Sequence, residues 1–327
     1  MSSFENQAVL SWLFHQESAS LKVNQVHFSR YQEADYANFS AKFDYRLRIV
    51  FTTQAAQQLD AWLGQLSIQS AICVLNRAND LQGIELSFNQ DITPSLSELT
   101  SSTQLEYFWV KQPLAKLHQP GLLVMDMDST AIEIECIDEL AKMAGVGDAV
   151  SQVTAQAMRG ELDFEQSLRA RVSKLKDAPA TIIDQLCSQL PIMPGLPASL
   201  SELQDNGWRL VVASGGFTPF VNDLKRKLKL DAAYANELVI ENDRLTGEVT
   251  GTVVDAEYKA KVVKHSSQQW GIEFEQTVSI GDGANDIPMI EAAALGLAFH
   301  AKPKLKQHAN VAISHLDLRA LVFCLQG

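Results

Sequence analysis

The sequence predicts an α/β protein. We expect a Rossmann-like parallel sheet with a helical cap inserted into it, preceded by a small α+β domain of the ferredoxin-like kind. Three observations support this. Apolar strand segments alternate with helical segments after about residue 120, the first two of these strands are separated by about 80 mostly helical residues, and a β-α-β-β order precedes them all. A chain of 327 residues with 46% hydrophobic residues is long enough for about two such domains.

The β-α-β-β order lies between residues 43 and 88. In FDYRLRIVF (43–51), apolar and mostly polar residues alternate, which is typical of a half-buried strand. Helical spacing follows over 54–66, and two further strands are predicted at 71–75 and 84–88. No cluster of catalytic residue types occurs here. A regulatory or dimerising module and a packing domain without a ligand therefore remain equally open interpretations.

The predicted domain boundary is the segment VKQPLAKLHQPG (110–121), where two prolines and a glycine interrupt the pattern. We therefore divide the chain into residues 1–115 and residues 116–327.

The predicted parallel sheet contains three apolar segments, LLVMD (122–126), RLVVAS (209–214) and TVSIGD (277–282). Each ends in small or acidic residues, and active-site loops of α/β folds follow the carboxyl ends of their strands. The helical residues between the first two strands far exceed what one crossover helix needs. We therefore predict a helical cap insertion at about 133–193.

The charge of the chain limits its partners. A formal net charge of −12 repels nucleic acid and anionic membranes, so we expect neither as a partner. No apolar run approaches the about 18 residues of a membrane span. No signal peptide is recognised, and four cysteines without a CxxC pair are typical of reduced proteins. We expect a cytoplasmic protein.

Polar residues and glycines follow the three predicted strands and should meet in one crevice, because the carboxyl ends of parallel strands lie at the same edge. They are Asp126, Asp128, Ser214, Gly215, Gly216, Asp282, Asn285 and Asp286. Carboxylates without cysteine or histidine partners suit a hard cation, above all Mg²⁺. Backbone N–H groups of the SGG turn suit phosphate oxygens, and Lys259 could add a compact positive charge.

Two carboxylates one residue apart after a buried strand also suggest a division of chemical work. One can attack phosphorus and form an aspartyl-phosphate. The other can protonate the leaving oxygen and later take a proton from the hydrolytic water.

This constellation resembles the haloacid dehalogenase-like phosphatases. The family's segments, DxDx[ST], a strand-terminal Ser or Thr, a lysine and GDxxxD, read here as DMDST, VVASGG, Lys259 and GDGAND in the same order. The match is stronger still with the phosphoserine phosphatase family within that superfamily. DMDSTAIEIECIDELA, AMRGELDFEQSLRARVSKLKD, VVASGGF and GDGANDIPM resemble its segments and cover most of residues 121–300.

The resemblance implies Mg²⁺-dependent hydrolysis of O-phospho-L-serine to L-serine and phosphate, the last step of serine biosynthesis. Asp126 would be the nucleophile and Asp128 the general acid and base. Asp126, the backbone carbonyl of Asp128 and Asp282 would hold Mg²⁺, and Asp286 would support the metal without binding it directly. The residues that the resemblance assigns to the phosphate are Ser214, Gly215, Lys259 and Asn285.

The resemblance also places the groups that select the substrate. Glu135 would bind the ammonium group of phosphoserine and Arg171 its carboxylate, where bidentate pairing favours arginine. Spacing alone leaves Glu133 as a competitor of Glu135. DFEQ (163–166) predicts a helix start with a capping box, and on that helix Arg169 and Arg171 point to nearly opposite faces.

The resemblance further implies an ACT-like N-terminal domain that regulates the enzyme or joins two copies into a homodimer, and a small β-flap at 247–254. Two other functions remain open from the sequence. The phosphoryl group could pass to another alcohol such as homoserine, or the chain could be a catalytically silent amino-acid-binding regulator. The presence of Asp126, Asp128, Lys259 and Asp282 argues against the silent regulator.

Overall fold

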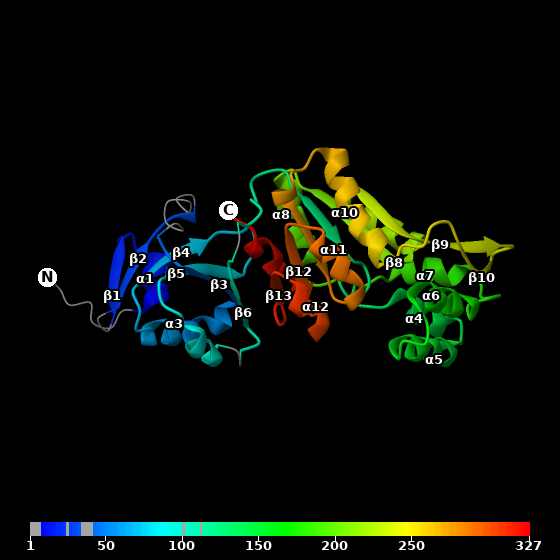
Figure 1. The fold of residues 1–327 in the computed structure, drawn as a ribbon, viewed down its shortest axis with the longest axis horizontal. Coiled ribbons are helices and arrows are strands. Elements are labelled where there is room, and N and C mark those ends of the chain that lie inside the picture. The colour runs from blue at the N-terminus through cyan, green and yellow to red at the C-terminus, as the bar shows by residue number, and fades with distance from the viewer. Residues whose placement is uncertain (1–7, 24–25, 34–41, 100–101, 112) are drawn as a thin grey trace.

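The computed structural model describes residues 8–23, 26–33, 42–99, 102–111 and 113–327. It contains two β-sheets, a smaller one in the N-terminal lobe and a larger one in the C-terminal lobe (Figure 1). The C-terminal segment of the chain lies between the two lobes, and the helices of the cap lie at the far end of the larger lobe (Figure 1). The predicted fold class is confirmed.

The N-terminal lobe has a six-stranded sheet with the order β1-β2-β4-β5-β3-β6. Its strands are β1 Ser20–Val23, β2 Val26–Arg30, β3 Tyr45–Phe51, β4 Ser70–Leu75, β5 Gln82–Phe88 and β6 Leu105–Trp109. Its helices are α1 Val9–His15 and α3 Ala56–Gln65, with 3-10 turns η2 Thr53–Ala55 and η3 Thr93–Glu98. The predicted β-α-β-β unit is confirmed as β3-α3-β4-β5, whereas the sequence did not predict α1, β1, β2 and β6.

Strand β3 shows why this sheet forms. Leu47, Ile49 and Phe51 share one cluster with the buried apolar residues of α1 and α3. Val50, one residue out of step, belongs to the cluster on the opposite face, and Arg48 bonds to the C-terminal segment there. Successive side chains of a strand point to opposite faces. The alternation therefore lets one face bind helices and the other face bind the larger lobe.

The C-terminal lobe has a seven-stranded sheet with the order β10-β9-β8-β7-β11-β12-β13. Its strands are β7 Leu122–Met125, β8 Arg209–Phe217, β9 Ala232–Glu241, β10 Arg244–Thr250, β11 Thr277–Gly281, β12 Leu295–Phe299 and β13 Val311–Ile313. Neighbouring strands from β9 to β13 are parallel, and β10 joins β9 as an antiparallel hairpin. The three predicted strands are therefore the three central ones.

Helices surround this sheet and form the cap. The cap region between β7 and α8 holds α4 Cys136–Met143, α5 Gly147–Met158, α6 Phe164–Ser173 and α7 Thr181–Ser188. The others are α8 Leu196–Asp205, α9 Thr218–Leu228, α10 Ala256–Trp270, α11 Ile287–Glu291 and α12 Pro303–His308, with 3-10 turns η4 Phe274–Gln276, η5 Ala284–Asp286 and η6 Leu318–Cys324. No helix within the described part of the chain is both long and apolar enough to cross a membrane.

The central strand β7 is buried on both faces. Leu122 and Val124 pack with apolar residues of α10 and α11 in one cluster. Leu123 and Met125 belong to the cluster that includes residues of α8, α9 and η6. A strand covered on both faces reads as a continuous apolar run, which explains why LLVM shows no alternation.

Strand β8 is longer than predicted, since it continues from Ser214 through Phe217. Its pairing with β9 shifts register between Ala213 and Phe217. The side chain of Asn236 on β9 donates to the carbonyl oxygens of Gly215 and Gly216 at 2.8 and 3.3 Å, which holds the glycines in an extended conformation.

The C-terminal segment connects the two lobes. Arg48 of β3 donates to the carbonyl oxygens of Phe323 and Leu325 at 2.7 and 2.6 Å. Arg77, in the loop after β4, donates to Leu325 O at 2.7 Å. Apolar residues of the N-terminal sheet and of η6 also share one continuous buried cluster.

Two carboxylates complete this interface. Glu33 accepts from Arg77 at 2.9 Å and from the N–H of Gly327 at 2.6 Å. Glu85 is fully buried and pairs with Arg48 at 2.7 Å. Because the buried charges have ionic partners, the two lobes can share a largely dry interface.

Candidate active site

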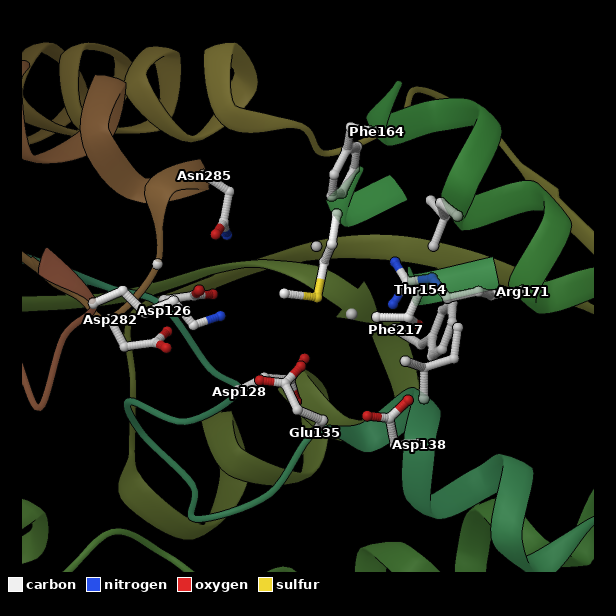
Figure 2. A pocket seen from close by; sticks show the side chains of 17 residues that line it. Asp126, Asp128, Glu135, Asp138, Thr154, Phe164, Arg171, Phe217, Asp282 and Asn285 are labelled. Atoms are coloured by element: carbon white, nitrogen blue, oxygen red, sulfur yellow. The ribbon is translucent and has the colours of Figure 1, made fainter. Parts of the chain in front are cut away.

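A cavity of about 390 Å³ lies where the central strands end and the cap helices face the sheet. Figure 2 shows the residues that line it. Asp126 and Asp282 lie at one end, Arg171 and Asp138 lie at the other, and Asp128 and Glu135 lie between them. The sequence therefore correctly predicted that the polar ends of these strands meet in one crevice.

Asp126 follows β7 directly and is 4% exposed. Its own N–H donates to Ile280 O of β11 at 3.0 Å, and its Oδ1 accepts from the N–H of Met127 at 2.7 Å. Its Oδ2 lies 2.8 Å from Nζ of Lys259. One oxygen is thus held by the backbone and the other by a cation, so the carboxylate has a fixed orientation.

Lys259 reaches this point from the first turns of α10. The helix begins after Asp255, whose side chain caps it by accepting from the N–H of Tyr258 at 2.8 Å. The ammonium group of Lys259 is 1% exposed and also contacts Asp286 at 2.8 Å. Burial alone lowers the pKa of Lys259, but the charges of Asp126 and Asp286 raise it above its usual value, so the group stays charged.

Asp286 organises the loop after β11. Its Oδ2 accepts from the N–H groups of Asp282 and Gly283 at 3.1 and 3.0 Å. Gly281 leaves the space that this carboxylate fills, since a Cβ there would lie 2.4 Å from Asp286 Oδ2. Asp286 is fully buried and supports the loop, whereas Asn285 is exposed and lines the cavity.

The carboxylates of Asp126, Asp282 and Asp286 each offer an oxygen within 4.8 Å of the others. Burial first, and then the charge of Asp286, raise the pKa of Asp126 above its usual value. The same two causes raise the pKa of Asp282 to about 6. Three carboxylates beside one ammonium group leave an excess of buried negative charge, and hard oxygen ligands of this kind fit a divalent cation such as Mg²⁺.

Asp128 faces the cavity from the turn that follows β7. Its Oδ1 accepts from the N–H of Cys136 at the start of α4 at 3.0 Å. Burial, followed by the charge of Glu135, raises its pKa to about 7. Asp128 can therefore hold a proton near neutral pH, whereas Asp126 lies against the cation Lys259.

The glycines after Ala213 allow close approach. A Cβ on Gly215 would lie 2.9 Å from the ring of Phe164 on the cap, and one on Gly216 would lie 3.1 Å from Asp128 Oδ2. Ser214 is fully buried, and its hydroxyl accepts from the N–H of Gly216 at 2.8 Å. The backbone of this segment lines the cavity, while the Ser214 side chain lies behind it.

The structure separates the alternatives that spacing left open. Both glutamates are exposed, but Glu135 lines the cavity and accepts from Ser129 Oγ at 2.9 Å, whereas Glu133 is not part of the lining. Arg171 lines the cavity, whereas Arg169 pairs with Glu165 on the other side of α6 at 2.7 Å. The difference between Arg169 and Arg171 follows from the helical geometry that the sequence predicted, because residues two apart cannot share a helix face.

The sequence analysis missed three polar residues of the cavity, Lys302, Thr154 and Asp138. The N–H of Lys302, on the loop after β12, donates to Asp282 O at 3.2 Å. Its position after an apolar strand could have identified Lys302. Asp138 lies one helical turn beyond Glu135, which is the signal that could have identified it.

Comparison with known proteins finds one family model and several relatives that carry the same enzyme name. A family model described as haloacid dehalogenase-like hydrolase matches residues 123–291. The chain is 56% identical over 212 residues to a phosphoserine phosphatase of Haemophilus influenzae, covering 65% of this chain and 68% of that protein. It is 49% identical over 237 residues to a phosphoserine phosphatase of Vibrio cholerae, covering 72% of each chain.

The fold is also similar to a solved structure. The crystal structure of a probable phosphoserine phosphatase from Vibrio cholerae, in an unliganded form, superposes with a TM-score of 0.71 at 42% identity. The similarity covers 86% of each chain. This coverage reaches into the N-terminal lobe, because residues 116–327 make up only about two thirds of the chain.

Proposed function

The chain belongs to the haloacid dehalogenase-like hydrolases, and from this premise we propose that it hydrolyses O-phospho-L-serine to L-serine and phosphate. The observation that carries the proposal is the cavity itself. It has a buried aspartate against a lysine at one end and an arginine with carboxylates at the other. The end with the aspartate and the lysine suits a phosphate, and the end with the arginine and carboxylates suits a zwitterionic amino-acid group. The reaction would complete serine biosynthesis, in the cytoplasm.

Asp126 is the proposed nucleophile. Its carboxylate oxygen forms a bond to phosphorus while the bond from phosphorus to the serine oxygen breaks. Asp128, with a pKa raised to about 7, gives its proton to that leaving oxygen. Water then attacks phosphorus, Asp128 takes a proton from the water, and the bond from phosphorus to Asp126 breaks. Both aspartates return to their starting states, and one water is consumed.

The phosphate-binding residues surround this centre. We assign the backbone of Gly215, the hydroxyl of Ser214, the ammonium group of Lys259 and the side chain of Asn285 to phosphate binding. Lys259 already contacts Asp126 and would neutralise charge on the reacting phosphoryl group. The Ser214 hydroxyl accepts from Gly216 N–H in this structure, and its own O–H can still donate to a phosphate oxygen.

The donor set fits Mg²⁺, held by Asp126, the backbone carbonyl of Asp128 and Asp282, with Asp286 orienting the loop that carries Asp282. When bound, Mg²⁺ would neutralise phosphate charge and orient the phosphoryl group. Asp286 contributes a further role of its own, because it holds Lys259 and the Asp282 backbone in place together.

At the far end, Glu135 is assigned to the substrate ammonium group and Arg171 to its carboxylate. Arg171 is half-buried, and among the described residues no carboxylate lies within ion-pair distance of it. Its guanidinium is therefore available for the bidentate pairing that carboxylates favour.

The test is phosphate release with Mg²⁺ from O-phospho-L-serine, O-phosphothreonine, phosphohomoserine and an aryl phosphate. We expect a strong preference for phosphoserine and reversible loss of activity on chelation. Activity on the aryl phosphate alone would contradict the substrate but keep the aspartate chemistry. Activity that survives complete chelation would contradict the role of the metal.

For the N-terminal part we propose an ACT-like domain over residues 1–115 joined to the phosphatase domain over 116–327, with a cap at about 133–193. The β-α-β-β unit supports this proposal. The domain would regulate the enzyme or form a homodimer. Sedimentation of the full chain with and without serine tests both roles, and a monomer unaffected by serine would contradict them.

A further inference from the structure

We propose that Asp138 is a specificity-determining residue that, together with Glu135, recognises the ammonium group of the substrate and excludes analogues that lack one. This inference rests on the proposed function and extends it. It assigns a second carboxylate to the amino-acid end of the cavity.

Asp138 is positioned for this role. It lies in the first turn of α4, is half-buried and lines the cavity. Among the described residues its carboxylate accepts no hydrogen bond and forms no ion pair within 4.0 Å. Glu135, by contrast, already accepts from Ser129 at 2.9 Å. Asp138 therefore presents the carboxylate that is less engaged with the protein.

Arg171 defines the other side of the same space. Figure 2 shows Arg171 and Asp138 at the end of the cavity away from Asp126, with Glu135 on the side of Asp138 that faces Asp128. Burial lowers the pKa of Arg171, and Asp138 opposes this more strongly than Glu135 does. Asp138 is thus the acid with the stronger influence on the guanidinium, although the two groups lie too far apart to form an ion pair.

The charges of this end favour a zwitterion. Glu135 and Asp138 offer two carboxylates beside which the substrate ammonium group could lie, and Arg171 offers a guanidinium across from them. The carboxylate on the same carbon would then face Arg171. A ligand with the carboxylate but without the ammonium would place a third negative charge beside the two acids, so Asp138 would also act by repulsion.

A purely structural role for Asp138 makes a different prediction. An acid in the first turn of a helix stabilises the helix dipole, and Glu139 shares that position in α4. Asp148 also lies in the first turn of its helix, α5, is exposed, and does not line this cavity. Asp148→Asn therefore reproduces the structural effect without changing the site.

The experiment compares the wild type, Asp138→Asn and Asp148→Asn on phosphorylated ligands, used as substrates or competitive inhibitors. O-phospho-L-serine carries both groups, O-phosphoethanolamine only the ammonium, 3-(phosphonooxy)propionate only the carboxylate, and an aryl phosphate neither. For Asp138→Asn we expect KM for phosphoserine to rise about tenfold or more, since a charge-assisted contact is lost. The inhibition constant or KM of phosphoethanolamine should rise similarly.

The same variant should bind 3-(phosphonooxy)propionate at least as well as the wild type does, and kcat for the aryl phosphate should change less than about threefold. Asp148→Asn should match the wild type throughout, and Asp138→Glu should recover part of the phosphoserine affinity.

If Asp138→Asn weakens the carboxylate-only ligand and leaves phosphoethanolamine unchanged, Asp138 acts through Arg171 and the proposal is wrong. Equal KM values for all ligands in the variant and the wild type would also overturn it. A wild type without preference for phosphoserine over the aryl phosphate would overturn the proposed function as well.

Discussion

At the scale of single residues, one buried ammonium group, that of Lys259, forms ion pairs with two carboxylates of the site. Lys259 is held between Asp126 and Asp286, 2.8 Å from each, and almost no water reaches it. A buried ammonium group is stable only with such partners. Lys259 thereby holds one oxygen of the Asp126 carboxylate, and the N–H of Met127 holds the other.

The first prediction concerns Asp126→Asn, which keeps the shape of the side chain and removes its charge. We expect kcat for phosphoserine to fall more than about 10³-fold, because an amide cannot serve as the nucleophile. The unfolding temperature should not fall, because the variant removes one of three neighbouring carboxylates that repel each other. Phosphate release and a melting curve measure these effects, and appreciable residual turnover would contradict the nucleophile assignment.

The second prediction compares Arg171→Ala with Arg169→Ala on the same helix. Loss of Arg171 should lower kcat/KM for phosphoserine by about 10- to 100-fold, the value of a charge-assisted pairing, with an aryl phosphate nearly unaffected. Arg169 is exposed and pairs with Glu165, so its loss should change neither substrate. Steady-state kinetics on both substrates distinguish the variants, and equal losses on both by Arg171→Ala would refute a carboxylate contact.

At the scale of elements, helix α6 illustrates how local sequence positions a distant group. Asp163 caps the helix by accepting from the N–H of Gln166 at 2.8 Å, and the Gln166 side chain accepts from the N–H of Asp163 at 3.1 Å. The predicted capping box is confirmed. It fixes the start of a helix that carries Phe164 against Gly215 and Arg171 into the cavity.

The third prediction follows from that cap. Asp163→Ala should destabilise α6 by about 1 kcal/mol, because the N–H of Gln166 loses the side-chain acceptor that caps the helix. Amide exchange within α6 should then accelerate about fivefold if the helix opens locally. Glu165→Ala is the matched control, since Glu165 forms a surface pair that contributes little. Unchanged exchange in Asp163→Ala would show that packing alone fixes this helix.

At the scale of the whole molecule, the N-terminal sheet and the C-terminal segment form one structural unit. Glu106 of β6 accepts from the N–H groups of Ser314 and Leu316 at 2.6 and 3.2 Å, just after β13. Together with Arg48 and Arg77, it binds the last residues of the chain to the first lobe. We therefore expect the lobes to unfold together.

The fourth prediction uses Glu33 in this interface. Burial alone raises its pKa, but hydrogen bonds from Arg77 and the charges of Arg77 and Arg48 bring the pKa below its usual value of 4.5. A lowered pKa means that its stabilisation is fully present above about pH 4.5 and is lost as pH falls through the folded-state pKa. Glu33→Gln should therefore unfold at a lower temperature than the wild type at pH 7.

The difference at pH 7 should correspond to about 1–2 kcal/mol and shrink progressively below pH 4.5. Melting curves across pH 3 to 7 measure it. Glu98→Gln serves as the control, because Glu98 is exposed in the same lobe. A difference that stays constant down to pH 3 would contradict the ionic role of Glu33.

Much of the catalytic lobe was predictable because its signals are local. Strands buried on both faces read as apolar runs, and the acids and glycines after them identify their carboxyl ends. The three central parallel strands, the capping box at Asp163 and the meeting of Asp126, Asp128 and Asp282 follow from these patterns, whereas the order of all seven strands was not predicted. In the N-terminal lobe, β3, α3, β4 and β5 were found for the same reason.

The elements that the sequence analysis did not predict depend on contacts between residues far apart in the chain. Strands β1, β2 and β6 have short patterns that become strands through the neighbours with which they pair. Strand β8 extends to Phe217 because Asn236 holds its glycines. The choice of Glu135 over Glu133 required the folded turn after β7.

The interface between the lobes shows the same limit most clearly. Arg48 bonds to Phe323, 275 residues away, and nothing near Arg48 in the sequence indicates a partner. The residues after the predicted strands were enough to indicate phosphate chemistry at carboxylates, because active-site loops follow the carboxyl ends of parallel strands. Which charges are buried together could be seen only in the folded chain, because burial is a property of the packed chain rather than of any segment.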